Sequence, residues 1–235
     1  MNKSTNTPKP LRSDWPVIVA LIALSIVPFV AGIARLVDLA SGSEITAENA
    51  RFFAAPAPVV LHIIAASLFN ILGAFQFAPK FRSRNWFWHR NSGRLLIACG
   101  FIAAISGVWM TQFYALHPLQ LQGNLLYGFR LFIGSAMAVS IGLSLAAILQ
   151  RNVAQHRAWL IRAYAIAQGA GTQVLVFLPW ELIFGKPNEQ TRDILMILAW
   201  VINLTIAEWV IRRKPSRITS KPLSSKPPTK LSQAN

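Results

Sequence analysis

The sequence predicts an all-α integral membrane protein, a bundle of six transmembrane helices with both the N and C termini in the cytoplasm. The first observation is composition, because 54% of the residues are hydrophobic and only 13% are charged, about half the charged share of soluble domains. The second is that the apolar residues form six stretches of about 20 residues each. The third is that Lys and Arg concentrate in alternate polar segments.

Six spans follow from the lengths of the apolar stretches. About 20 helical residues, rising about 1.5 Å each, cross the roughly 30 Å of bilayer hydrocarbon. The expected spans lie near residues 15–37, 58–77, 95–116, 125–149, 159–184 and 194–211.

The first span also resembles a secretory signal peptide, because basic residues precede it. Its apolar run exceeds the roughly 7 to 15 residues of a signal peptide. The segment 31–34, Ala-Gly-Ile-Ala, is also a poor cleavage site. An uncleaved helix is favoured, and cleavage would leave five spans with an exterior N terminus.

The distribution of charge predicts the orientation. With this topology, 18 Lys and Arg residues lie on the side of the termini and five on the other: Arg35, Arg51, Arg130, Lys186 and Arg192. Cytoplasmic loops carry such an excess, so the protein is expected in the cell membrane as a multi-pass protein. The net charge of +15 then indicates attraction to anionic lipid headgroups rather than to nucleic acid.

Three regions are expected along the chain. Residues 1–13 form a disordered basic N-terminal tail, residues 14–212 the membrane domain, and residues 213–235 a disordered basic C-terminal tail, since both tails are rich in Lys, Ser, Thr and Pro. Cys99 is the single cysteine, which excludes an intrachain disulfide and a metal site built on cysteines.

Two helices carry small residues at spacings of four, which allow close backbone approach in membranes. This pattern favours a tight hairpin between the fourth and fifth spans, although chance in Ala-rich and Gly-rich helices also produces it. The same stripes leave homo-oligomerisation open. The residues are Gly134, Ala138 and Gly142 in the fourth span and Ala163, Ala167 and Gly171 in the fifth.

The second span has a polar stripe, because His62, Asn70, Gly73 and Gln76 fall within an arc of about 120° on a helix. Such a stripe is expected to face the bundle interior, since lipid offers these groups no hydrogen-bond partner. It either bonds neighbouring helices or lines a ligand site.

Ionisable residues within spans are costly and mark functional or paired sites. Arg162 and Glu208 lie at similar depth near the cytoplasmic side and are expected to form a buried ion pair. Arg130 lies towards the exterior, where it either forms a polar cluster with His62 and Glu181 or extends to the headgroups.

Two His-Arg motifs precede outward-running spans on the cytoplasmic side. They suggest a duplicated hairpin, with spans two and three matching spans four and five. The motifs supply a candidate anion-binding cluster, because arginines and helix N-termini suit phosphate or carboxylate. Its residues are His89, Arg90, Arg94, His156, Arg157 and Arg162.

These motifs resemble those of a family of bacterial multi-pass membrane proteins, domain of unknown function 2306. The resemblance rests on His-Arg-x-x-Gly-Arg at 89–94, on His-Arg-x-Trp-x-Ile-Arg-x-Tyr-Ala at 156–165 and on the His62 helix, and covers roughly residues 55–180. Leu160 stands where the pattern carries Met. The family implies location and topology and no activity.

Three functions remain open. The first is binding of an anionic small molecule or lipid headgroup by the His/Arg cluster. The second is electron transfer on haem b, as in cytochrome b561-like bundles, with axial ligands drawn from His62, His117, His89 and His156. An enzyme is disfavoured, because the sequence contains no nucleophile–base set or metal-binding motif; no catalytic residues or metal ligands are assigned.

Overall fold

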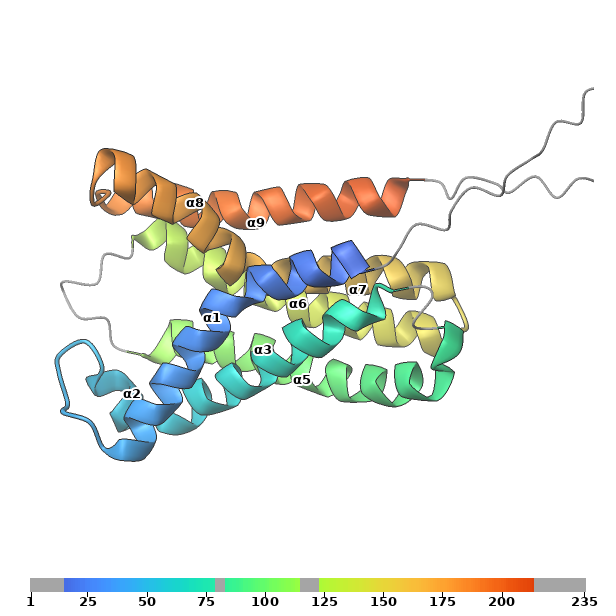
Figure 1. The fold of residues 1–235 in the computed structure, drawn as a ribbon, viewed down its shortest axis with the longest axis horizontal. Coiled ribbons are helices and arrows are strands. Elements are labelled where there is room, and N and C mark those ends of the chain that lie inside the picture. The colour runs from blue at the N-terminus through green and yellow to red at the C-terminus, as the bar shows by residue number, and fades with distance from the viewer. Residues whose placement is uncertain (1–14, 79–82, 115–122, 214–235) are drawn as a thin grey trace, which may run out of the picture.

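The computed structural model describes residues 15–78, 83–114 and 123–213, and within these ranges the chain forms only helices and short connections (Figure 1). The expected all-α bundle is therefore confirmed. The helices are α1 (Trp15–Ser41), α2 (Ala50–Ala54), α3 (Pro56–Gln76), α5 (Trp86–Phe113), α6 (Asn124–Leu149), α7 (Val153–Ala167), α8 (Gly169–Phe184) and α9 (Glu189–Arg212).

Four helices form the core. α3 and α5 pack as one hairpin and α6 and α7 as a second; α5 also packs on α6, and α3 on α7. α3 therefore lies diagonally across from α6, and α5 across from α7. The apolar residues at their centre include Phe69, Met137, Ile141 and Tyr164.

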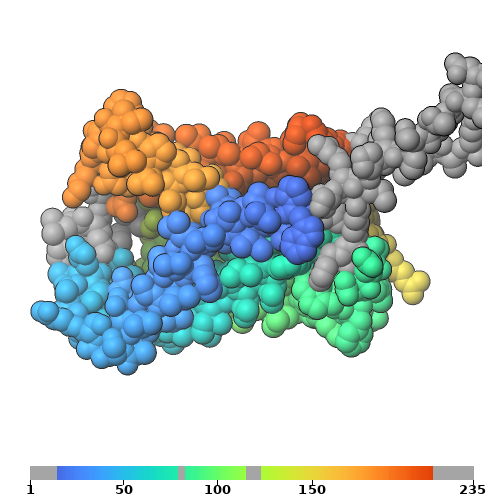
Figure 2. Space-filling model, in the orientation of Figure 1, coloured from blue at the N-terminus to red at the C-terminus, as the bar shows by residue number. Residues whose placement is uncertain are grey.

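The remaining long helices cover one side of this core. α1 packs on α3 and α8, while α9 packs on α6, α7 and α8, and Figure 2 shows α1 crossing this face. Side-chain hydrogen bonds join α9 to α7. Asn203 Nδ2 donates to the Ala165 carbonyl at 3.1 Å, and Trp200 Nε1 donates to the Ile166 carbonyl at 3.2 Å.

The bundle has two ends, which we name by their contents. The α2 end contains α2, the C-termini of α1, α5 and α8, and the N-termini of α3, α6 and α9. The terminal end holds Trp15 and Arg213, where the described chain starts and stops (Figure 1). Both ends of the described chain thus lie on one side, as an even number of crossings requires. The cytoplasmic location of that side stays a prediction.

Of the described helices, five are long and apolar enough to cross a membrane, and α8 is a shorter apolar helix. The fifth expected span, residues 159–184, is thus divided into α7 and α8. Gln168 stands at the junction, where its Nε2 donates to Tyr164 Oη at 2.8 Å and to Ser25 Oγ at 3.2 Å.

Two glycines permit close helix contacts beyond this junction. A Cβ on Gly169 would collide with the Trp200 indole of α9, and one on Gly171 with the Leu24 carbonyl of α1. Both neighbours can therefore approach the start of α8 only where no side chain intervenes.

The interpretation of the small-residue stripes as the α6–α7 contact is wrong for the positions that can be traced. The glycines of α6 face α5, because a Cβ on Gly134 would meet Val108 at 2.7 Å and one on Gly142 would meet Phe101 at 3.9 Å. Gly171 faces α1. α6 and α7 do pack together, but these glycines lie at the contacts with α5 and α1. The tails expected at residues 1–13 and 213–235 lie outside the described residues, apart from Arg213.

Candidate functional site

A cavity of about 360 Å³ extends from the α2 end into the core, and we call it the central cavity. This volume lies at the lower end of the range for small-molecule sites. All four core helices contribute, together with α2, α8 and α9, and most lining side chains are apolar. Its polar and aromatic lining residues are Arg51, Phe52, His62, Phe69, Asn70, Thr111, Tyr114, Arg130, Gln173 and Trp200.

The mouth of the central cavity is organised around Phe52. The guanidinium carbons of Arg35 and Arg51 lie 4.5 Å and 4.6 Å from its ring centroid. Tyr114 meets the Phe52 ring edge-on at 5.4 Å and donates its hydroxyl to the Ala55 carbonyl at 2.7 Å. These contacts hold α2 against the end of α5.

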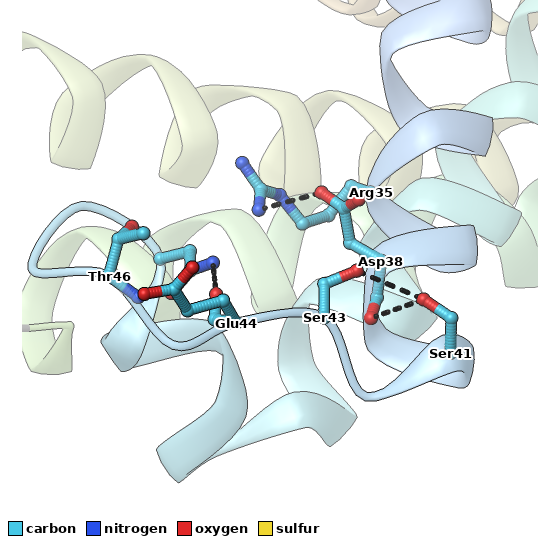
Figure 3. A network of polar contacts seen from close by, with 7 residues as sticks. Arg35, Asp38, Ser41, Ser43, Glu44 and Thr46 are labelled. Atoms are coloured by element: carbon cyan, nitrogen blue, oxygen red, sulfur yellow. Dashed lines mark hydrogen bonds and ion pairs between the residues drawn. The ribbon is translucent and has the colours of Figure 1, made fainter.

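The connection between α1 and α2 is ordered by its own polar groups. Arg35 forms an ion pair with Asp38 at 3.3 Å, and Ser41 Oγ donates to the Asp38 carbonyl at 3.3 Å (Figure 3). Asn49 Nδ2 donates to the Glu44 carbonyl at 3.0 Å. The segment thus positions Arg35 beside the Phe52 ring.

Positive charge gathers at this mouth. Arg51 and Arg130 both line the central cavity. Burial, and then the like charge of Arg35, lower the pKa of the Arg51 guanidinium from its ordinary value, yet arginine stays protonated at neutral pH. Arg130 lies within electrostatic range of Arg51, Arg192 and Asp193. An anion at the mouth would therefore be attracted by two cations.

His62 lies on the α3 wall with a defined orientation. Its Nδ1 is 2.9 Å from the Ala103 carbonyl and 3.1 Å from Ser106 Oγ, both on α5. A carbonyl can only accept, so Nδ1 carries a proton and the Nε2 of the neutral ring is an acceptor. The expected inward orientation of His62 is confirmed.

The rest of the α3 polar stripe also faces the interior. Gln76 Nε2 donates to Ser92 Oγ of α5 at 2.8 Å, and a Cβ on Gly73 would meet the Tyr164 ring of α7 at 2.6 Å. Asn70 receives the Tyr164 hydroxyl on its backbone carbonyl at 2.6 Å. The stripe therefore bonds neighbouring helices at Gln76 and lines a cavity at His62 and Asn70.

A second, smaller cavity of about 140 Å³ adjoins the first on the far side of this wall. We call it the side cavity. It lies among α1, α3, α7 and α8, and Phe29 of α1 contributes one wall. His62, Ala66, Asn70, Ala167 and Ala170 line both cavities.

The expected cluster of Arg130, His62 and Glu181 is only partly assembled. Arg130 and His62 line the same cavity, but Glu181 lines neither cavity. The acid near Arg130 is Asp193, which is 2% exposed and accepts the backbone N–H groups of Gly123 at 3.2 Å and Leu126 at 2.9 Å. The sequence alone does not identify this role of Asp193, because its partners lie about 70 residues away.

At the terminal end, two residues of the His/Arg cluster are engaged in helix contacts. His156 Nδ1 lies 2.8 Å from Ser144 Oγ and 3.0 Å from the Ser144 carbonyl, which fastens α7 to α6. Arg162 Nε lies 2.6 Å from Glu208 Oε1, with 26% and 31% of the two side chains exposed. Arg212 adds a contact to Glu208 Oε2 at 3.4 Å.

The other members of the cluster do not converge. His89 is half-buried in the first turn of α5, with its ring 6.2 Å from that of Trp86. Arg90, Arg94 and Arg157 are exposed. α5 and α7 are diagonal in the core, and neither cavity includes a residue of this cluster.

The candidate haem ligands are distributed in the same way. Of the histidines that the structure describes, only His62 lines the central or the side cavity; His117 lies outside the described residues. Within the described ranges, no group of three His, Cys, Asp or Glu side chains is placed to hold a metal ion.

Comparison with known families decides the membership of the chain. A family model described as predicted membrane protein (DUF2306) matches residues 59–211, about two thirds of the sequence. The chain belongs to the DUF2306 family. This range contains α5, α6, α7 and α8 and most of α3 and α9. No curated protein and no solved structure matches this DUF2306 protein. It is a membrane protein whose apolar helices contact lipid.

Proposed function

We propose that this DUF2306 protein binds an anionic amphipathic molecule in the central cavity. The anionic group lies near Arg51 and Arg130, and the apolar part extends along α3 towards Phe69. The single observation that carries the proposal is the combination of two arginines with a largely apolar cavity of about 360 Å³. Apolar pockets with a few placed polar groups are typical of small-molecule sites.

The charges at the mouth determine the sign of the ligand. Two guanidinium groups close together repel each other, and an anion between them would relieve this repulsion. Arginine also binds carboxylate and phosphate through paired hydrogen bonds. Asp193 also lies within electrostatic range of Arg130, and its carboxylate accepts the backbone N–H groups of Gly123 and Leu126.

The proposal includes a location. The excess of Lys and Arg on the side of the termini supports a cytoplasmic terminal end in the cell membrane. The mouth of the central cavity would then open to the exterior.

The His/Arg cluster at the terminal end has weaker support as an anion site or as a site for lipid headgroups. His156 and Arg162 contact Ser144 and Glu208, so a ligand would have to compete with these contacts. The exposed Arg90, Arg94 and Arg157 remain suited to loose contact with anionic headgroups.

Haem b is the second candidate, and the hydrogen bond of His62 favours it. Axial histidines donate their other ring nitrogen to a carbonyl or carboxylate, as His62 Nδ1 does to the Ala103 carbonyl. Met137 of the diagonal helix α6 lines the same cavity and offers a thioether. A reduced b-type absorption spectrum that His62→Ala abolishes would support haem; a colourless folded preparation from haem-replete cells would remove it.

A fluorescence titration tests the main proposal. Purified protein in nanodiscs is titrated with dansyl-labelled undecanoic acid, and dodecanoic acid is used to displace the probe. We expect saturable binding that Ala66→Leu abolishes, because the larger side chain fills the space between the two cavities. Ala34→Leu is the matched control, since Ala34 is exposed on α1.

Charge variants locate the anionic group. Arg130→Gln should lower the affinity about tenfold or more, since bonds to charged groups are worth about 1.5–3 kcal/mol, whereas Arg94→Gln should have little effect. The reverse result would place the anion at the terminal end. Absence of saturable binding in the wild type would contradict the proposal.

A further inference from the structure

The central cavity has an unequal supply of hydrogen-bond donors and acceptors. Several of its polar groups already have protein partners. Thr111 Oγ1 donates to the Gly107 carbonyl at 2.8 Å, and Gln173 Nε2 donates to the Met196 carbonyl at 3.3 Å. Tyr114 donates to the Ala55 carbonyl. The two arginines supply donors at the mouth.

The α3 wall instead presents two acceptor atoms that receive no hydrogen bond from the described residues. His62 Nε2 is an acceptor, because Nδ1 holds the proton, and it makes no hydrogen bond among the described residues. Asn70 behaves similarly. Its Nδ2 donates to the Ala66 carbonyl at 3.0 Å, which fixes the orientation of the amide. Its Oδ1 is buried and has no hydrogen-bond partner in the described part of the chain.

Such acceptors favour a ligand that carries a hydrogen-bond donor. A buried acceptor left without a donor costs about 1–3 kcal/mol, which applies to Asn70 Oδ1 and would apply to His62 Nε2 once a ligand excluded water from the two cavities that His62 lines. An amphiphile with only a carboxylate and an alkyl chain would leave His62 Nε2 against hydrocarbon. A hydroxylated ligand would supply the missing donor.

We propose that the ligand of the central cavity is a hydroxylated anionic amphiphile whose hydroxyl group donates to His62 Nε2. This inference rests on the proposed function and adds the chemical class of the ligand. His62 and Arg130 each lie six residues from the start of their helix at the α2 end, about 9 Å deep. A hydroxyl group close to the anionic group, as in a β-hydroxy acid, matches this equal depth, whereas a hydroxyl group at the far end of the chain would lie deeper.

Asn70 provides an internal comparison. It lies eight residues beyond His62 on α3, about 12 Å deeper along the helix. A hydroxyl group at the ω-carbon of a long chain would approach Asn70 and not His62.

The test compares three displacing ligands in nanodiscs: dodecanoic acid, β-hydroxydodecanoic acid and ω-hydroxydodecanoic acid. We expect the β-hydroxy acid to displace the dansyl probe at about one tenth of the concentration that dodecanoic acid requires, because one well-formed hydrogen bond in a dry site changes affinity about tenfold. The ω-hydroxy acid should show no such advantage.

Two variants assign the effect to a residue. His62→Met removes the acceptor and should abolish the preference for the β-hydroxy acid while dodecanoic acid still binds. Asn70→Leu, the matched variant on the same wall, should retain the preference. If His62→Met does not fold, the displacement of the probe by the three acids on the wild-type protein still tests whether a hydroxyl group near the carboxylate is preferred.

The outcomes separate this inference from the proposed function. Equal displacement by all three acids, or a preference for the ω-hydroxy acid, would overturn the assignment to His62 and leave the anion-binding cavity standing. Retention of the β-hydroxy preference in His62→Met would also overturn it. Binding of none of the acids would overturn the proposed function, and this inference with it.

Discussion

Residues that are costly inside a membrane were the ones that sequence reasoning could identify. The cost of burying His62, Arg130, Arg162 and Glu208 marks them without any knowledge of the fold, and the structure places His62 and Arg130 at one cavity. The pairing of Arg162 with Glu208 could be predicted from their similar depth. The partner of His62 could not, because it is a distant backbone group, the Ala103 carbonyl. Asp193 was missed for the same reason, since its partners are amide groups of another helix.

The role of Asp193 gives the first prediction. Asp193→Ala removes the acceptor that caps α6 and leaves two buried N–H groups without it, so we expect a loss of about 0.5–2 kcal/mol. This corresponds to a fall of about 2–4 °C in melting temperature for each kcal/mol, which thermal unfolding in detergent measures.

Asp38→Ala is the control for this prediction. Asp38 pairs with Arg35 in an ion pair whose side chains are 31% and 45% exposed, and exposed pairs contribute little. A larger fall in melting temperature for Asp38→Ala than for Asp193→Ala would contradict the capping role.

At the scale of elements, the positions of the helices were predictable and the division of one helix was not. Apolar length alone gives the spans, because a bilayer requires about 20 apolar residues. The junction at Gln168 depends on contacts with Ser25 and Tyr164, which become visible only when α1 and α7 are adjacent. Gly169 and Gly171, which follow this junction, can be read from the sequence. Their spacing does not show which helix packs against each of them.

Two glycine substitutions test this packing and should have opposite effects. Gly171→Ala places a methyl group against the Leu24 carbonyl, so α1 and α8 must separate and the melting temperature should fall. Gly128→Ala adds a methyl group where no atom lies within 4 Å. A helical alanine is favoured over glycine by about 0.5–1 kcal/mol, so this variant should be equally or more stable.

Thermal unfolding of the two purified variants in the same detergent gives the comparison. A stable Gly171→Ala protein with an unchanged or raised melting temperature would show that α1 does not approach α8 as closely as described.

For the whole molecule, topology was the most predictable property, whereas the cavity was not. Hydropathy predicts the spans, and five of the described helices are long and apolar enough to cross a membrane, while the fifth predicted span is divided between α7 and the shorter α8. The described chain begins and ends on one side of the bundle (Figure 1). A cavity depends on side chains from seven helices failing to fill one space, and no local pattern encodes this. Sequence reasoning therefore placed the most interesting surface at the His/Arg motifs, whereas the larger cavity lies at the α2 end.

The orientation gives a prediction at this scale. Ser43→Cys at the α2 end should react with a membrane-impermeant maleimide in intact cells, and Ala154→Cys at the terminal end should react only after permeabilisation. Both positions are exposed or half-exposed, and the native Cys99 is buried, so background labelling should be low. Labelling of Ala154→Cys but not Ser43→Cys in intact cells would reverse the topology.

An anionic amphiphile is the proposed occupant of the central cavity. Titration of dansyl-labelled undecanoic acid into nanodiscs that carry the wild type, Ala66→Leu or Ala34→Leu tests this occupancy. We predict saturable binding, displaced by dodecanoic acid, for the wild type and Ala34→Leu and none for Ala66→Leu. Equal binding by all three folded proteins would contradict the proposal, because Ala66 lines both cavities and a leucine side chain there would occupy part of the space proposed for the apolar chain.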